Sequence, residues 1–252
     1  MILRRITKHV KDQNWFAVGL DFFIVVFGVF VGLQVQQWAL ERQRQNSEGQ
    51  YLMRLHGEVE LLIASRASYD ETRPRFSGLL GEAVDILASG SDDIKLTQAH
   101  CDAIAGSSHM TTPPADLPTI RELLSSGRLD QIQSIDVRAA ILVYTQHVAR
   151  ARDLIAAISD HAEDLSRHFP ALIKVHYGPD PDRTDRVWIN PVCDTLAMSK
   201  DIAFLNGLGL NAYQYKVYTD RAVLPVSREL AKLHETLDQA LDIKHDGAAA
   251  VP

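Results

Sequence analysis

The chain has 252 residues, of which 46% are hydrophobic, and a formal net charge of −6. This length suffices for one domain with a buried core, or for one domain with an appendage. Phosphate contacts need clustered Lys and Arg, and no basic cluster follows the N-terminus, so the composition argues against a nucleic-acid partner. Residues 1–14 carry a net charge of +3, residues 15–40 of −1 and residues 41–252 of −8. The sequence therefore combines a basic tail, an apolar stretch and an acidic body.

The apolar stretch contains 19 consecutive residues without a formal charge, residues 22–40. As a helix this run would be about 28 Å long, close to the hydrocarbon thickness of a bilayer. Trp15 and Trp38 bracket the run, where interfacial aromatic anchors are expected. No small-x-small cleavage site follows, so we predict an uncleaved signal anchor, a transmembrane helix over residues 15–40 in contact with membrane lipid. The alternative is a buried helix of a soluble protein, because the segment contains Asp21 and three glutamines.

The charges on the two sides of this segment predict its orientation. Four basic residues precede it, namely Arg4, Arg5, Lys8 and Lys11. On the other side Arg42 and Arg44 stand among Glu41 and Glu48. Because basic residues favour the cytoplasmic side, residues 1–14 are expected in the cytoplasm and residues 41–252 outside it. This topology predicts a single-pass membrane protein with an exported C-terminal domain.

Small and polar residues share one side of the predicted transmembrane helix. At 100° per residue, Asp21, Gly28, Gly32 and Gln36 fall within one narrow arc, and most of the phenylalanines lie opposite. Such a division is typical of a helix that packs against another helix in the membrane. We therefore predict a helix-packing interface, either with a second copy or with a larger membrane complex. The alternatives are chance placement of the glycines with Asp21 at the cytoplasmic interface, and an ion path at Asp21.

The body beyond the membrane has the apolar spacing of helices, and we predict an all-α bundle. The membrane helix is expected to continue as far as Ser68 or Thr72 and to end before Pro74. Shorter helices are expected around residues 79–87, over 93–105 and over 117–126, the last closed by a left-handed Gly127.

The longest heptad-like pattern runs from Val137 to Phe169 and ends at Pro170. The spacing over residues 226–241 and 52–62 predicts two helical partners for it. No convincing strand pattern is present; residues 172–177 and 186–189 are the best candidates, within a loop-rich insertion near 170–193.

The apolar run Phe23–Trp38 ends in glutamines and a tryptophan, and the pattern Tyr51-Leu52-x-x-Leu55-x-x-Glu58 follows. The middle of the chain contains Leu124-Ser125-Ser126-Gly127. These parts of the sequence resemble an uncharacterised family of bacterial single-pass inner-membrane proteins, a domain of unknown function. Where the family has Asn and Glu after the tryptophan, this chain has Ala39 and Leu40. The resemblance implies an inner-membrane protein with a helical body and supplies no catalytic residues.

The sequence contains no recognisable catalytic, cofactor or metal motif. His161 and His168 are seven residues apart on the predicted long helix, too far apart to share one ion without other ligands. Asp180, Asp182 and Asp185 lack the glycine and glutamate of a calcium loop. His100 and Cys101 are adjacent on a helix, so their side chains point in different directions and do not form a nucleophile and base. We therefore predict no enzyme activity, no cofactor and no metal ligand.

Both cysteines, Cys101 and Cys193, follow the membrane segment. In an oxidising periplasm they could form a disulfide that joins the Cys101 helix to the insertion. Two separate buried thiols are the alternative.

The predicted cytoplasmic tail is too short for a signalling or DNA-binding domain. The first functional hypothesis is a structural or accessory subunit that docks to a membrane-protein partner or self-associates. The second is a periplasmic ligand-binding or sensing bundle that acts through a partner protein. An enzyme is the third, and it would need converging titratable groups in a pocket.

Overall fold

The computed structural model describes residues 15–89, 95–179 and 187–244, and the predicted tail of residues 1–14 lies outside them. The elements are α2 (Trp15–Ala88), α3 (Gln98–Ala105), α4 (Pro118–Ser125), η1 (Leu129–Gln131), α5 (Ile135–Ser159), α6 (Leu165–His168), β1 (Ile173–Pro179), β2 (Val187–Cys193), α7 (Thr195–Met198), α8 (Ile202–Tyr218), η2 (Thr219–Val223) and α9 (Leu224–Leu241). Apart from one small sheet these are helices, so the predicted all-α class is confirmed. The chain divides into two compact units, Met1–Gln50 and Tyr51–Pro252.

The first unit contains the N-terminal part of α2. Every residue from Phe22 to Leu40 is exposed, with Phe22 at 71% and Trp38 at 65%. Among the described residues α2 is the one helix long and apolar enough to cross a membrane, and its most apolar stretch has no buried residue. A continuous apolar surface of this extent needs lipid or protein to cover it.

α2 continues through Pro74, so the predicted end before this residue is wrong. The helix extends to Ala88 and includes the shorter helix expected around residues 79–87. Proline here removes the hydrogen bond that its N–H would donate to the carbonyl of Asp70. The buried face nevertheless stays in phase, because Leu62 and Leu80 are 18 residues, or five helical turns, apart and both lie in the core. Burial of this continuous face offsets the lost hydrogen bond.

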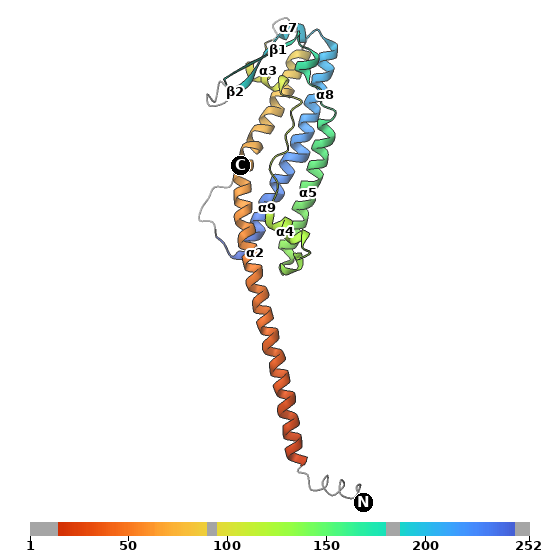
Figure 1. Ribbon diagram of the computed structural model, residues 1–252. Coiled ribbons are helices and arrows are strands. Elements are labelled where there is room, and N and C mark those ends of the chain that lie inside the picture. Colours follow the sequence, from red (N-terminus) through yellow and green to blue (C-terminus); the bar gives the residue numbers. More distant parts are fainter. Residues whose placement is uncertain (1–14, 90–94, 180–186, 245–252) are drawn as a thin grey trace, which may run out of the picture. The chain divides into compact units, whose positions relative to one another are not determined.

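The second unit is a helical bundle in which the remainder of α2, α5 and α9 lie side by side (Figure 1). The apolar positions expected from the heptad-like spacing are buried in one core: Leu52, Leu55, Val59 and Leu62 of α2; Val137, Ile141, Tyr144, Ala151, Ile155 and Ile158 of α5; and Val226, Leu230, Leu233 and Leu237 of α9. The prediction that these three segments share a core is therefore confirmed.

α5 ends at Ser159, well before the predicted end at Phe169. The chain turns here and then forms the short α6, which Asp164 caps. Asn211 of α8 holds the turn, because its Oδ1 accepts from the N–H of Glu163 at 3.0 Å and its Nδ2 donates to the Glu163 carbonyl at 2.8 Å. The buried amide of Asn211 thus replaces helical hydrogen bonds at this turn. Leu165 of α6 still packs into the same core, which is why the apolar spacing in the sequence continues past the end of α5.

The insertion near 170–193 contains a two-stranded antiparallel sheet, which the sequence indicated only weakly. The register runs from Ile173 opposite Cys193 to Pro179 opposite Val187. Figure 1 shows this hairpin near α3 and α7 at one end of the bundle. The interpretation of the segment as loop-rich is therefore only partly correct.

A disulfide bond between Cys101 and Cys193 fastens the hairpin to α3, with the two Cα atoms 5.9 Å apart. Beside it, Nε2 of Gln98 donates a hydrogen bond to the Pro191 carbonyl at 2.9 Å. An isolated two-stranded ribbon is marginally stable in water. These two links give the ribbon an anchor on the helical body.

The sequence did not predict α8. The side chain of Asp201 caps this helix by accepting from the N–H of Phe204. Apolar residues such as Leu210 and Tyr213 lie on its exposed side, so no clean apolar stripe marks the helix in the sequence.

Two shorter helices have sharp boundaries. α3 begins after the capping residue Thr97 rather than at residue 93, so the predicted start was too early. α4 ends as predicted, followed by Gly127 with a positive φ of 67°. Only glycine adopts this conformation without strain.

Candidate functional site

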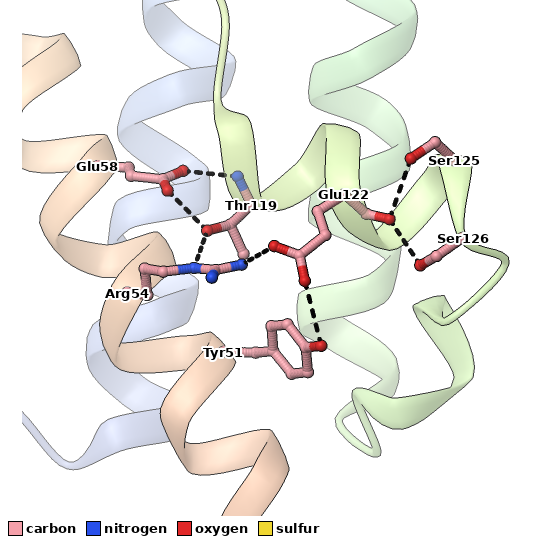
Figure 2. Close-up of polar contacts among 7 residues, drawn as sticks. All are labelled: Tyr51, Arg54, Glu58, Thr119, Glu122, Ser125 and Ser126. Carbon is pink, nitrogen blue, oxygen red and sulfur yellow. Dashed lines mark hydrogen bonds and ion pairs between the residues drawn. The ribbon is translucent and has the colours of Figure 1, made fainter.

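The N-terminus of α4 is capped by a carboxylate from α2 (Figure 2). Leu117, the residue before α4, has no side chain that can cap the helix, and Pro118 has no N–H. Glu58 supplies the cap instead. Its Oε2 accepts from the N–H of Thr119 at 2.9 Å, and its Oε1 accepts from the Thr119 hydroxyl at 2.7 Å. The contact fixes where α4 lies against α2.

Arg54 extends this network along α2. Its Nε donates to the Thr119 hydroxyl at 2.7 Å, and its Nη2 pairs with Glu122. The Tyr51 hydroxyl donates to the same carboxylate at 3.4 Å, and the guanidinium of Arg54 lies 5.4 Å from the Tyr51 ring centre. Arg54 and Glu122 are about half exposed, so the pair orients α4 and stabilises it by about 1 kcal/mol at most.

A groove of about 470 Å³ lies on another side of α4, where this helix faces α5. Its walls are mostly apolar and include Ala115, Leu117, Ile120, Leu124, Tyr144, Val148 and Ala149. The volume falls within the range of small-molecule sites. α4 is thus held by α2 through polar contacts and forms one wall of a groove with α5.

Several polar residues also line this groove. The Tyr144 hydroxyl donates to the Ala115 carbonyl at 2.8 Å, and burial raises the pKa of Tyr144, so the phenol stays neutral. Arg121 pairs with Asp116 at 2.7 Å. Arg152 also lines the groove, and the described residues contain no ion-pair partner for it. Apolar walls and a free guanidinium suit a small ligand with an apolar body and an anionic group.

A smaller cavity of about 90 Å³ is bordered by several of the same residues and by Arg66 of α2. Arg66 is only 2% exposed. Its guanidinium donates to the carbonyls of Pro114 at 2.7 Å and Val223 at 3.0 Å, and to the Ser227 hydroxyl at 2.9 Å. Burial lowers the pKa of Arg66, and the nearby carboxylate of Asp70 opposes this shift. Arg66 therefore joins three segments from inside the core.

The spacing of apolar residues in α2 contains a signal for this buried arginine. Leu52, Leu55, Val59 and Leu62 repeat at steps of three and four, and Arg66 occupies the next step of the series. A charged residue in phase with a buried stripe indicates an internal network, because an unpaired internal charge is costly.

Arg66 contacts the π-helix η2, which joins α8 to α9. The N–H of Leu224 bonds to the carbonyl of Thr219, five residues earlier, as a π turn requires. Pro225 follows and has no N–H for the carbonyl of Arg221, so regular α-helical bonding fails at this place. The π turn lets the helix continue, and Arg66 satisfies the Val223 carbonyl.

The predicted helix-packing residues lie in the first unit. Gly28, Gly32 and Gln36 are exposed, and a Cβ atom at either glycine would meet no other atom within 4 Å. Trp15 and Asp21 belong to α2, but the structure does not describe their side chains. Trp38 is exposed, with the guanidinium of Arg42 5.7 Å from its ring centre.

The histidines considered from the sequence do not come together. His161 lies in the turn after α5 with its Nδ1 2.7 Å from the Ala157 carbonyl. His168 belongs to α6, and its Nδ1 lies 2.6 Å from a carboxylate oxygen of Glu163. His161 and His168 therefore do not share one long helix, as the sequence had led us to expect. The aspartates of the suggested calcium loop, at 180, 182 and 185, lie outside the described residues.

Metal-ligating atoms converge elsewhere in the described part of the chain, at His56 of α2 and at His234 and Asp238 of α9. No motif spacing marks this group in the sequence, because His56 lies far from His234 and Asp238 in the chain. Comparison of the chain with family models, with curated proteins and with solved structures gives no match.

Proposed function

We propose that this chain is a single-pass, membrane-anchored helical protein that serves as a non-enzymatic structural or accessory subunit. The observation that carries the proposal is the segment Phe22–Leu40, in which every side chain is exposed although most are apolar. In a bilayer, lipid and a second membrane helix would cover this surface. The body beyond it is a bundle of helices packed around one apolar core.

Three features support a periplasmic body on the bacterial inner membrane. The basic residues concentrate before the apolar segment, as expected for a cytoplasmic N-terminus. The disulfide between Cys101 and Cys193 suits an oxidising compartment. The resemblance of Phe23–Trp38 to a family of inner-membrane proteins agrees with both.

The small and polar side of the anchor is the proposed docking surface. Gly28 and Gly32 have open space above their backbones, so another helix can approach them closely. Gln36 can share hydrogen bonds across such a contact. The partner is a membrane protein or a second copy of the chain.

Replacement of Gly28 and Gly32 by leucine should weaken this docking about tenfold, because the added side chains hold the helices apart. Chemical crosslinking in membranes, followed by purification in mild detergent and mass spectrometry, measures the oligomeric state and the copurifying proteins. Phe23→Leu and Phe30→Leu, on the opposite side of the helix, are the controls. The docking hypothesis fails if the double glycine variant keeps the same partners and the same oligomeric state.

A second candidate function is a ligand-binding bundle that signals through a partner protein. The groove of about 470 Å³ between α4 and α5 favours it, since Arg152 stands beside apolar walls there. A small ligand needs a concave site of this kind to bury most of its surface.

Ligand-observed NMR with 2-naphthoate, an apolar anion, tests the groove. Binding should be lost in Ala149→Trp, which fills the groove, and should weaken about fivefold in Arg152→Ala. Arg150 is an exposed residue of α5 that does not line the groove. The Arg150→Ala variant should therefore bind 2-naphthoate as the unaltered chain does. Equal binding by the Ala149→Trp variant would exclude the groove as the site.

A further inference from the structure

In the second unit, α2 and α9 each direct one histidine and one carboxylate toward the other helix. His56 and Glu60 are four residues apart on α2, and His234 and Asp238 are four residues apart on α9. Residues with this spacing lie on one side of a helix, one turn apart. The two pairs therefore form a four-residue cluster across the contact between α2 and α9, which we name the His–carboxylate cluster.

The distances within this cluster are short. His56 Nε2 lies 2.8 Å from Asp238 Oδ1, and His234 Nδ1 lies 3.6 Å from Asp238 Oδ2. Glu60 closes the cluster, with one oxygen 3.7 Å from His56 Nδ1 and the other 3.9 Å from His234 Nε2. One ligand atom from each of His56, His234 and Asp238 can be chosen so that all lie within 4.8 Å of one another.

These separations suit a tetrahedral metal site. Zinc bonds of about 2.0 to 2.2 Å to nitrogen and oxygen place neighbouring ligand atoms about 3.3 Å apart. Small rotations of the imidazoles, which are stacked with centroids 4.9 Å apart, would bring the three ligands to that spacing. Glu60 lies beside the other ring nitrogen of each histidine, where its carboxylate can orient the imidazoles, and water would take the fourth position on the ion.

The ligand types point to one class of metal. Imidazole nitrogens bind zinc and other late first-row transition metals, whereas calcium and magnesium prefer sites made of oxygen ligands alone. The side chains of His56, Asp238 and His234 are only 11%, 15% and 21% exposed, so they are already held in place before any ion arrives. A partly buried site with ligands from two helices resists dissociation of those helices.

We propose that the His–carboxylate cluster binds one divalent transition-metal ion, with Zn²⁺ the best fit, and that the ion clamps α2 to α9. The proposal rests on the second unit alone and stands whether or not the anchor docks to a partner. His–carboxylate ion pairs without a metal are the competing explanation, and metal titration separates the two.

The test uses the full chain in mild detergent, without a polyhistidine tag and after treatment with a chelator. Calorimetric titration with ZnCl₂ should give one ion per chain, and CaCl₂ should give no binding. His234→Ala and Asp238→Asn should each weaken Zn²⁺ binding at least tenfold. His161→Ala removes a histidine exposed beyond α5 and should leave the affinity unchanged.

Two further measurements do not depend on the variants folding. A hundredfold excess of Zn²⁺ over its dissociation constant should raise the melting midpoint of the unaltered chain by roughly 5 to 10 °C. Co²⁺ bound to the unaltered chain should show the intense visible bands of a four-coordinate ion. Absence of bound Zn²⁺, a pale octahedral Co²⁺ spectrum, or equal affinity in folded His234→Ala would each overturn the proposal.

Discussion

Reduction of the disulfide between Cys101 and Cys193 is expected to lower the free energy of unfolding by roughly 4 to 5 kcal/mol. The two residues are 92 positions apart, so the bond closes a long loop in the unfolded chain and removes much of its entropy. In the folded chain the same bond attaches the hairpin of β1 and β2 to α3. Replacement of both cysteines by serine should have the same effect.

Denaturant unfolding with and without a reductant measures this loss. The Cys101→Ser and Cys193→Ser double variant is the control, because its unfolding should no longer respond to the reductant. If the unaltered chain keeps the same midpoint and the same gel mobility after reduction, the bond makes no contribution and the prediction is wrong.

Arg66→Ala is expected to destabilise the second unit by about 3 to 5 kcal/mol. The substitution leaves the carbonyls of Pro114 and Val223 buried without their donor and opens a cavity inside the core. It also removes the hydrogen bond that the Arg66 Nε donates to the Ser227 hydroxyl. A lysine at position 66 should recover only part of the loss, since a single ammonium does not match three acceptors in one plane.

Arg75→Ala is the matched control, because Arg75 lies on the same helix and is exposed. Its free energy of unfolding, measured by chemical denaturation, should change by about 0.5 kcal/mol or less. An Arg66→Ala variant as stable as Arg75→Ala would show that the buried hydrogen bonds do not stabilise the fold.

The sequence predicts the fold well where one helix face is continuously apolar. The spacing of Leu52 to Leu62, of Val137 to Ile158 and of Val226 to Leu237 identified the seams of the bundle. It failed where a contact distant in the chain decided the structure. Asn211 holds the turn that follows α5 by bonding to the backbone of Glu163, and nothing in the local spacing marks that position.

Local rules also failed at Pro74 and at α8. Proline usually ends a helix, but the core on both sides of Pro74 favours its continuation more strongly. α8 was missed because its exposed side is also apolar, which hides the period of 3.6 residues.

The candidate site was only partly predictable. The small and polar side of the anchor follows from spacing alone, and it remains a prediction. The cap that Glu58 provides for Thr119, and the approach of His56 to Asp238, join residues 61 and 182 positions apart. Such pairings depend on the bundle topology, which no single segment encodes.

The π turn of Thr219–Val223 makes the length of the chain critical at one place. An α-helix advances 100° per residue, so deletion of one residue here would rotate all of α9 by about 100° relative to α8. Leu230 and Leu237 would then leave the core, and His234 would turn away from α2. A one-residue insertion would cause a rotation in the opposite sense. A change of length is tolerated best in the exposed loops of this protein, whereas this helical junction admits substitution but not insertion or deletion.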